Sequence, residues 1–322
     1  MDDEERLYLE LLEEGGTPSA IDKNVKILSL RGSLMMNLPQ DAARQNSVSV
    51  LLNILESDLH TEGARLNAAW TITKMTCLSK QMIHVIVDKN GIVALKNGIL
   101  TSTGKLRVHC IMAIGNIALC CSDCKTKCRE AGILDEIATL MAGRVHTEMH
   151  NVKIIVSCVM NIMHGGVHNG DVPISTIRLL TTCLTDLIRS HITELDLAEH
   201  CLWTLAWIAD DMQSGAGIDI VINEPGLLEL VFDILSLVPL HKLHEGALHI
   251  LGNIITGNNT QIGVVTSHPQ FYEILFCMST IVNLLIIAHD DKKKLMIGSG
   301  TEERGRDYDK CESSADFTTV HI

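Results

Sequence analysis

Apolar residues along most of the chain recur at helical intervals, and short polar breaks separate one apolar stretch from the next. The alternation runs from about Lys26 to Ser279, and many of the longer stretches open on Gly or Pro. Apolar positions three and four residues apart are typical of amphipathic helices. The pattern therefore predicts a long series of helices joined by short turns.

One motif of small and apolar residues returns along this series. Its copies are Ala68-Ala69-Trp70-Thr71-Ile72, Met112-Ala113-Ile114-Gly115-Asn116, Val159-Met160-Asn161-Ile162, Cys201-Leu202-Trp203-Thr204-Leu205 and Ala247-Leu248-His249-Ile250-Leu251-Gly252-Asn253. The equivalent positions are 42, 45, 46 and 46 residues apart, in the order Trp70, Met112, Ser157, Trp203 and His249. A second set of markers stands 41 residues apart, namely Gly91, Gly132 and Pro173. A period of about 40 to 47 residues is typical of armadillo and HEAT repeats. The sequence therefore predicts an all-α solenoid with one continuous core.

The chain divides into three regions by composition. Residues 1–25 are acidic at the front and end in a break that contains Gly and Pro. Residues 26–294 carry the helical repeats, which number about five or six at this period. Residues 295–322 are polar and Gly-rich without an apolar stripe, so we expect them to be disordered.

The amino-acid composition narrows the class of partner. Hydrophobic residues make up 46% of the chain and aromatic residues only 3%, which suits helices that pack through aliphatic side chains. The formal net charge is −13. Because phosphate binding needs clustered Lys and Arg, this charge argues against a nucleic-acid partner and favours a basic one. The eleven cysteines are scattered through apolar stretches and the acidic start shows no signal peptide, so we expect a reducing compartment.

The longest uncharged apolar run is too short for an ordinary membrane helix. It extends from Ile274 to Ala288 and has 15 residues, whereas a bilayer span needs roughly 20. We expect a core helix there and no membrane partner. A tail anchor flanked by Lys292-Lys293-Lys294 is the alternative.

Two groups of side chains invite a metal-site interpretation. Four cysteines fall within nine residues: Cys120, Cys121, Cys124 and Cys128. Adjacent Cys120 and Cys121 form a poor tetrahedral pair, and no second Cys-x-x-Cys motif occurs elsewhere, so we interpret the four as free thiols. Two histidine pairs have the four-residue spacing of ligands on a helix: His146 with His150, and His164 with His168. Both lack the Glu of a His-Glu-x-x-His site, and we interpret them as surface or capping residues.

No catalytic motif stands out in the chain. The sequence shows no nucleophile elbow, phosphate-binding Gly loop or dinucleotide fingerprint. We therefore expect neither an enzyme nor a bound cofactor or metal.

The repeated motif is similar to that of a known family. Gly252-Asn253-Ile254-Ile255-Thr256-Gly257 resembles the Gly-Asn-Ile-Val-Thr-Gly of importin alpha, and Leu66-Asn67-Ala68-Ala69-Trp70 and Ala113-Ile114-Gly115-Asn116-Ile117-Ala118 resemble its earlier repeats. The similarity spans roughly residues 26 to 280, at the interval of armadillo units. It implies an all-α, right-handed superhelical armadillo solenoid. It also implies a nuclear import adaptor of the cytoplasm and nucleus, whose concave groove binds basic localisation signals of cargo proteins.

The resemblance implies which residues bind the peptide. In the family, Asn residues hold the main chain of an extended peptide, while Trp rings flank its Lys and Arg side chains with an attraction of about 0.5 to 2 kcal/mol each. A Trp and an Asn four residues apart share one helix face, so stacked repeats place them in rows on the concave surface. Carried over residue by residue, the peptide-binding set is Trp70, Asn116, Asn161, Trp203, Trp207, Asp210 and Asn253.

Several positions depart from the family pattern. Lys74 stands where the Asn partner of Trp70 is expected, and Cys120 replaces an acidic residue. Met112 and Ser157 replace Trp residues. Lys74 repels a cationic peptide by about 1 kcal/mol if it is partly exposed. The second hypothesis is therefore an armadillo scaffold for other protein partners that has lost signal-peptide binding.

Two larger departures concern partner proteins. The family begins with a basic segment that binds importin beta, whereas residues 1–25 here are acidic, so the resemblance does not support recruitment of importin beta. The later repeats of the family would lie beyond Thr280, where this sequence becomes irregular. We expect a truncated or strongly diverged array.

Overall fold

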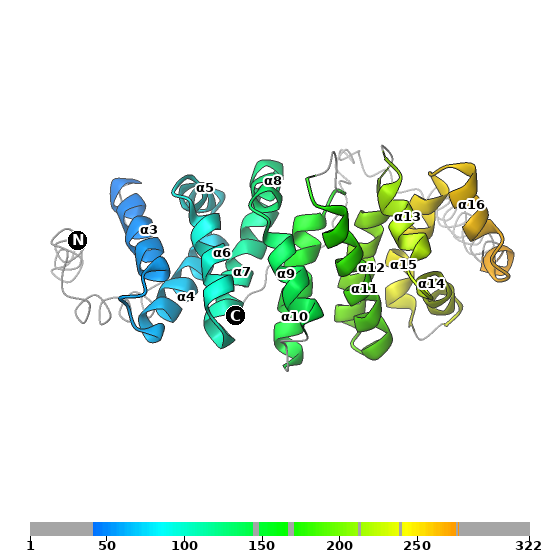
Figure 1. The fold of residues 1–322 in the computed structure, drawn as a ribbon, viewed down its shortest axis with the longest axis horizontal. Coiled ribbons are helices and arrows are strands. Elements are labelled where there is room, and N and C mark those ends of the chain that lie inside the picture. The colour runs from blue at the N-terminus through cyan, green and yellow to red at the C-terminus, as the bar shows by residue number, and fades with distance from the viewer. Residues whose placement is uncertain are drawn as a thin grey trace, which may run out of the picture.

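The structure is a computed structural model, and it describes residues 41–143, 148–166, 171–211, 214–237, 240–274 and 276. These residues fold into helices, and no strand occurs among them. Figure 1 shows the helices following one another in sequence order along the long axis of an extended array. The acidic segment 1–25, the tail 295–322 and nearly all of the apolar run from Ile274 to Ala288 lie outside the described residues.

The repeated motif forms a continuous row of long helices, which we call the third-helix row. Its members are α4 (Glu62–Leu78), α7 (Gly104–Cys120), α10 (Met149–Met163), α12 (Leu195–Ala209) and α15 (His241–Ile255). Each of them packs against the next, although about 40 residues separate them in sequence. The predicted period is therefore the distance from one member of this row to the next.

The remaining helices complete the repeats. The second helices are α3 (Asp41–Glu56), α6 (Gly91–Thr101), α9 (Ile133–Ala142), α11 (Ile174–Ser190) and α14 (Leu227–Ser236). The shorter first helices are α5 (Lys80–Asp88), α8 (Ser122–Glu130), α13 (Ala216–Asn223) and α16 (Asn259–Thr266). The repeat that contains α11 departs from this scheme, because the described residues between α10 and α11 contain no helix.

The hydrophobic pattern of each helix follows from its place in the array. Helix α11 buries Ile177, Leu180, Leu184 and Ile188, which are three and four residues apart, and so presents one apolar face to the core. Helix α7 lies between α4, α10, α6 and α8, and it buries every residue from Cys110 to Ala118. A fully buried Leu or Ile contributes about 1.5 to 3 kcal/mol. The third-helix row is therefore the spine of the hydrophobic core.

The turn before each second helix explains the Gly and Pro markers of the sequence. Asn90, Gly132 and Gly226 adopt positive φ angles of 60°, 70° and 67° immediately before α6, α9 and α14. Glycine takes this left-handed conformation without steric cost, and Asn tolerates it better than most residues. Pro173 occupies the corresponding place before α11.

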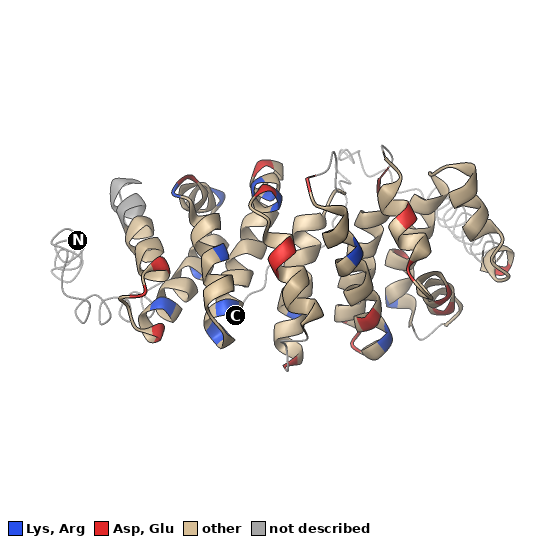
Figure 2. Ribbon diagram, in the orientation of Figure 1, with Lys and Arg blue, Asp and Glu red and all other residues tan. Residues whose placement is uncertain are grey.

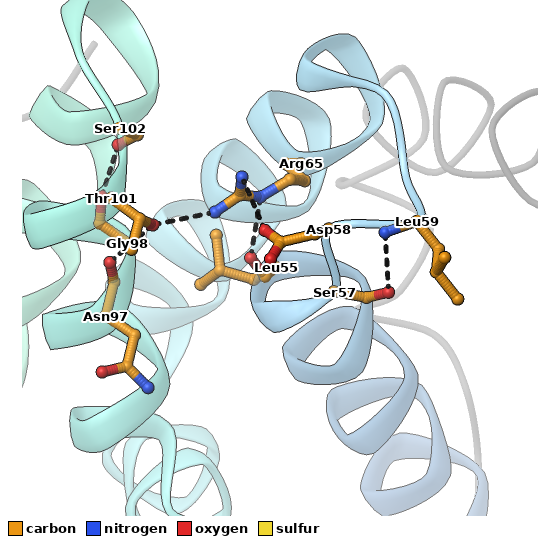
Figure 3. Close-up of polar contacts among 9 residues, drawn as sticks. All are labelled: Leu55, Ser57, Asp58, Leu59, Arg65, Asn97, Gly98, Thr101 and Ser102. Carbon is orange, nitrogen blue, oxygen red and sulfur yellow. Dashed lines mark hydrogen bonds and ion pairs between the residues drawn. The ribbon is translucent and has the colours of Figure 1, made fainter.

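Buried and half-buried arginines tie neighbouring elements together. Figure 3 shows Arg65 of α4 donating from Nε to the carbonyl oxygen of Leu55 at 3.0 Å, and from a guanidinium nitrogen to Thr101 Oγ1 at 3.1 Å. Arg129 of α8 also bonds across elements, donating to the carbonyl oxygens of Ile162 and Gly166 at 2.9 and 2.7 Å. The bonds to Leu55 and Ile162 satisfy carbonyls in the last turns of α3 and α10, which have no partner within their own helix. No helix in the described part of the chain is long and apolar enough to cross a bilayer.

Candidate functional site

The third-helix row brings the predicted peptide-binding residues onto neighbouring helices. Trp70 lies on α4, Asn116 on α7, Asn161 on α10, Trp203 and Trp207 on α12, and Asn253 on α15. Asp210 follows directly at the end of α12. Since these helices pack in order, the residues follow one another along one row. The side chains differ in their surroundings: Trp203 and Trp207 contact other rings, Trp70 contacts a lysine, and the Asn residues bond neighbouring helices.

Four rings form a contiguous series of contacts across α10, α12 and α15, and we call it the ring row. The ring of His164 lies 4.7 Å from that of Trp207, Trp207 lies 6.0 Å from Trp203, and Trp203 lies 4.6 Å from His249, all measured between centroids. His249 is exposed and the other three rings are partly exposed. The four-residue spacing of Trp203 and Trp207 puts both indoles on one helix face. The ring row is therefore a partly open aromatic surface that spans three repeats.

Trp70 sits at the opposite end of the third-helix row in a different environment. Lys74, one helical turn later, places its Nζ 5.5 Å from the centroid of the Trp70 ring. An ammonium group at this distance from an indole makes a cation–π contact. Lys74 therefore occupies the face of the Trp70 ring to which a basic side chain of a partner could otherwise bind.

Asn116 and Asn161 are buried between helices, each with 4% of its surface exposed. The amide of Asn116 donates to Thr76 Oγ1 at 3.0 Å and to Cys77 Sγ at 3.2 Å, both on α4. The amide of Asn161 donates to the carbonyl oxygen of Gly115 on α7 at 3.3 Å. In both cases the donor that a peptide backbone requires is turned toward the preceding repeat.

Asn253 makes the corresponding bond but is less enclosed. Its Nδ2 donates to the carbonyl oxygen of Ala206 at 2.9 Å, and the side chain is half-buried. The three Asn residues share one structural action, which is to bond the preceding member of the third-helix row. Such bonds give a mid-helix Asn a reason to be present, because Asn is mildly unfavourable there. Their part in peptide binding stays a prediction.

The two acidic residues after α12 differ in their surroundings. Asp211 accepts hydrogen bonds from the backbone N–H groups of Ser214 and Gly217, both at 3.0 Å, and from the Ser214 hydroxyl. Burial alone raises the pKa of this carboxyl, but the hydrogen bonds outweigh burial and hold its pKa below the usual value. Asp211 therefore shapes the turn into α13. Asp210, the C-cap of α12 and three residues after Trp207, is partly exposed.

The surroundings of His164, one of the two ring-row histidines, lower its pKa. The ammonium of Lys125 lies 3.1 Å from His164 Nδ1, and it donates to the His164 carbonyl oxygen at 2.9 Å. Burial lowers the pKa of His164, and the charges of Lys125 and Arg129 lower it further. A neutral imidazole can lie against Trp207 without adding a positive charge to this surface.

Charge divides the array into two halves. Residues 41–143 carry eleven Lys and Arg and nine Asp and Glu, whereas the described residues from 148 to 276 carry four and fourteen. Figure 2 shows blue segments prevailing from α4 to α8 and red segments from α9 onward. The ring row lies in the acidic half. A net negative surface attracts a cationic partner over a range of about 8 to 10 Å at moderate salt.

Comparisons with known proteins decide the fold. No protein-family model and no curated protein sequence matches the chain. Three similar solved structures are designed proteins. The designed armadillo repeat protein YIII(Dq)4CqI is 18% identical with a TM-score of 0.56, over 70% of this chain and 87% of that one. A computationally designed armadillo repeat protein for modular peptide recognition is 17% identical with a TM-score of 0.61, over 77% and 98%.

The third, YIII(Dq.V1)4CPAF, was solved in complex with the peptide (KR)4, and it is 17% identical with a TM-score of 0.58, over 77% and 98% of the two chains. The chain has an armadillo-repeat fold. The predicted all-α solenoid is confirmed by these likenesses and by the helical architecture. At this level of identity the comparisons establish the armadillo fold alone, and the resemblance to importin alpha stays a prediction.

Sequence reasoning found part of this armadillo surface and missed part of it. The register of the motif located both tryptophans of α12 and the row on which they lie. The sequence predicts a surface or capping residue at His164. This residue does end α10, but the structure also places its ring against Trp207. The available signal was its position at the end of the preceding repeat, 43 residues before Trp207.

Proposed function

We propose that the chain is an importin-alpha-like adaptor that binds Lys- and Arg-rich peptide segments along the third-helix row. The observation that carries this proposal is the ring row, which combines two tryptophans and two imidazoles on one partly open surface within the acidic half. Indole faces attract ammonium and guanidinium groups by about 0.5 to 2 kcal/mol each. Asp210, three residues after Trp207, adds a charge of the right sign. Such an adaptor would work in the cytoplasm and nucleus.

The spacing of the rings limits how a basic side chain can bind. A methylene stem inserted between two rings needs a centroid separation of about 7 to 8 Å, since each carbon contact takes about 3.5 to 4 Å. The separations in the ring row are 4.6 to 6.0 Å. Lysine and arginine side chains would therefore lie over the row rather than between its members. This placement predicts weaker binding than a groove with open slots between its tryptophans.

A solved likeness supports the chemistry of the proposal. One similar designed armadillo repeat protein was solved with the peptide (KR)4. Its fold therefore accommodates an alternating Lys and Arg segment. The acidic and aromatic half of this chain offers charges and rings suited to the same class of peptide.

A second candidate function is a general armadillo scaffold that binds another protein. Two observations favour it. Lys74 covers Trp70, and the Asn116 and Asn161 amides are engaged between repeats. These positions, on three of the five helices of the third-helix row, are therefore poorly suited to a cationic peptide. In this alternative the partner would contact surfaces other than the ring row.

Fluorescence anisotropy with a labelled Lys/Arg-rich peptide separates the two functions. The adaptor predicts saturable binding that weakens at least about tenfold when the key lysine of the peptide is replaced by alanine. A scrambled peptide of equal charge controls for simple electrostatic attraction. If both peptides bind equally and only salt abolishes binding, the scaffold function is favoured and the adaptor function is contradicted.

Import by permeabilised cells tests the finer claim. Fluorescent cargo bearing the same basic segment is supplied with this protein, with or without importin beta. Nuclear accumulation that needs the protein would establish an import adaptor. Peptide binding without accumulation would leave the armadillo surface as a peptide-binding scaffold and contradict the import role.

A further inference from the structure

A cluster of metal-ligating side chains that are not part of the ring row lies where two repeats meet. It consists of His84 on α5, Cys120 at the end of α7, and Cys121 and Cys124 at the start of α8. One potential ligand atom from each residue lies within 4.8 Å of every other. Figure 1 places α5 and α8 along the same edge of the array. The cluster therefore joins the first helices of two successive repeats.

The separations within the cluster approach those of a tetrahedral zinc site. His84 Nε2 lies 3.8 Å from Cys120 Sγ, and His84 Nδ1 lies 3.9 Å from Cys124 Sγ. Zinc binds thiolates at about 2.3 Å and imidazole at about 2.0 to 2.1 Å, so tetrahedral ligand atoms are about 3.5 to 3.8 Å apart. Only one of the two His84 nitrogens can bind the ion, and the four ligand atoms, which lie within 4.8 Å of one another, would move up to about 1 Å closer around it.

The local backbone already positions two of the thiols. Cys121 is the N-cap of α8, and its Sγ accepts a hydrogen bond from the backbone N–H of Cys124 at 3.5 Å. An N–H group donated to a sulfur ligand orients that ligand and stabilises its thiolate form. The Cys-x-x-Cys spacing then brings Cys124 back to the same side of the first turn. Cys128, one turn further along α8, is fully buried and lies outside the cluster.

The structure removes the objection that the sequence raised against zinc. That objection is that adjacent Cys120 and Cys121 form a poor tetrahedral pair and that no second Cys-x-x-Cys motif occurs elsewhere. Stacking of the repeats supplies His84, which is 36 residues before Cys120. Cys120 ends α7 and Cys121 caps α8, so the chain turns between them. Both thiols then lie within 4.8 Å of the other two ligand atoms.

We propose that His84, Cys120, Cys121 and Cys124 bind one Zn²⁺ ion as a structural site. Three thiolates and one imidazole form a closed, soft ligand set, which is typical of structural zinc and disfavours Mg²⁺ and Ca²⁺. On binding, each of the three thiols releases one proton to solvent, and His84 binds through a neutral nitrogen. The ion would fasten α5 to the junction between α7, the last helix of the same repeat, and α8, the first helix of the next.

Metal titration of the reduced full-length chain tests the site. Protein freed of metal by chelation is titrated with Zn²⁺ against a chromophoric competitor, and with Co²⁺ followed by its visible spectrum. We expect one equivalent of Zn²⁺ and the intense ligand-field bands of tetrahedral, thiolate-bound Co²⁺. Replacing His84 by Ala or Cys121 by Ser should each weaken the Kd at least about tenfold. Cys183→Ser on α11 is the matched control and should bind as wild type does.

Two further readouts keep a folding defect apart from the loss of a ligand. His84 is exposed, so His84→Ala should retain the helical circular dichroism of the wild type. Zn²⁺ should raise the Tm of the wild type but not of His84→Ala, and it should slow alkylation of the cluster thiols only in the wild type. Zn²⁺ affinity that survives His84→Ala and Cys121→Ser would overturn the proposal. So would reduced wild-type protein that takes up no metal and forms a disulfide in air.

Discussion

The two halves of the array share one architecture but present different surfaces. In the N-terminal half, residues 41–143, Lys74 covers Trp70, and basic residues slightly outnumber acidic ones. In the C-terminal half, the ring row crosses three repeats among a large excess of acidic residues. The packing of the third-helix row is common to both halves. A repeat fold therefore fixes where side chains stand, while single substitutions at the same register decide what each repeat can bind.

The largest expected difference between the halves is in peptide binding. Replacing Trp203 and Trp207 together by Ala should raise the Kd of a Lys/Arg-rich peptide about tenfold or more. The reason is that two cation–π contacts of about 0.5 to 2 kcal/mol each are lost. Trp70→Ala is the matched control and should change the Kd by less than about twofold. Anisotropy titrations measure all three proteins. Equal losses from both changes would show that the halves do not differ in this way.

The next largest effect concerns stability and is shared by both halves. Asn116→Ala and Asn161→Ala should each lower the free energy of unfolding by about 1 to 3 kcal/mol, since buried acceptors on the preceding repeat lose their donor. Asn253→Ala, at a half-buried site, should lower the free energy of unfolding by about 0.5 to 1.5 kcal/mol. Urea unfolding provides the values, with exposed Asn97→Ala as control. Stability unchanged in Asn116→Ala would mean that the Asn row does not join the repeats.

A smaller effect should come from uncovering the N-terminal tryptophan. Lys74→Asn removes a like charge and frees the face of Trp70, so a peptide long enough to reach α4 should bind tighter by up to about 1 kcal/mol. A short peptide that spans only α12 and α15 should not change. The comparison of the two peptides in one anisotropy series measures the effect. Equal tightening of the short peptide would place the gain outside Trp70.

The smallest expected effect is a pH dependence of stability. Burial lowers the pKa of His109, His164 and His200 below the ordinary value of about 6.5. Below that value the unfolded chain binds protons that the folded chain excludes, so the free energy of unfolding should fall from about pH 7.5 to about pH 5.5. Urea titrations at the two values measure it. A free energy of unfolding that rises as the pH is lowered from about 7.5 to about 5.5 would contradict the lowered pKa values of these histidines.

The sequence predicted the fold well because its signals repeat. A fixed period, a helix motif at one register and Gly or Pro before each second helix all follow from the geometry of one repeat. The placement of Trp203 and Trp207 on one face was predictable for the same reason. The direction of a side chain was harder to predict from the sequence. Asn116 occupies the predicted register, yet it bonds Thr76 and Cys77 across the repeat interface.

Contacts between repeats were the hardest to predict from sequence. His164 joins the ring row, and His84 joins three cysteines, through helices that are neighbours only after stacking. Neither histidine has a local motif that indicates its partners. Their partners are separated from them by about one repeat period, so the period itself is the signal to search with.

Tryptophan fluorescence tests the claimed difference between the halves most directly, because the chain holds only three tryptophans. In Trp70→Phe the emission reports the ring row alone, and in Trp203→Phe with Trp207→Phe it reports Trp70 alone. A non-fluorescent Lys/Arg-rich peptide should shift and saturate the emission of the first protein, while the emission of the second stays unchanged. A saturable change confined to the second protein would contradict binding at the ring row.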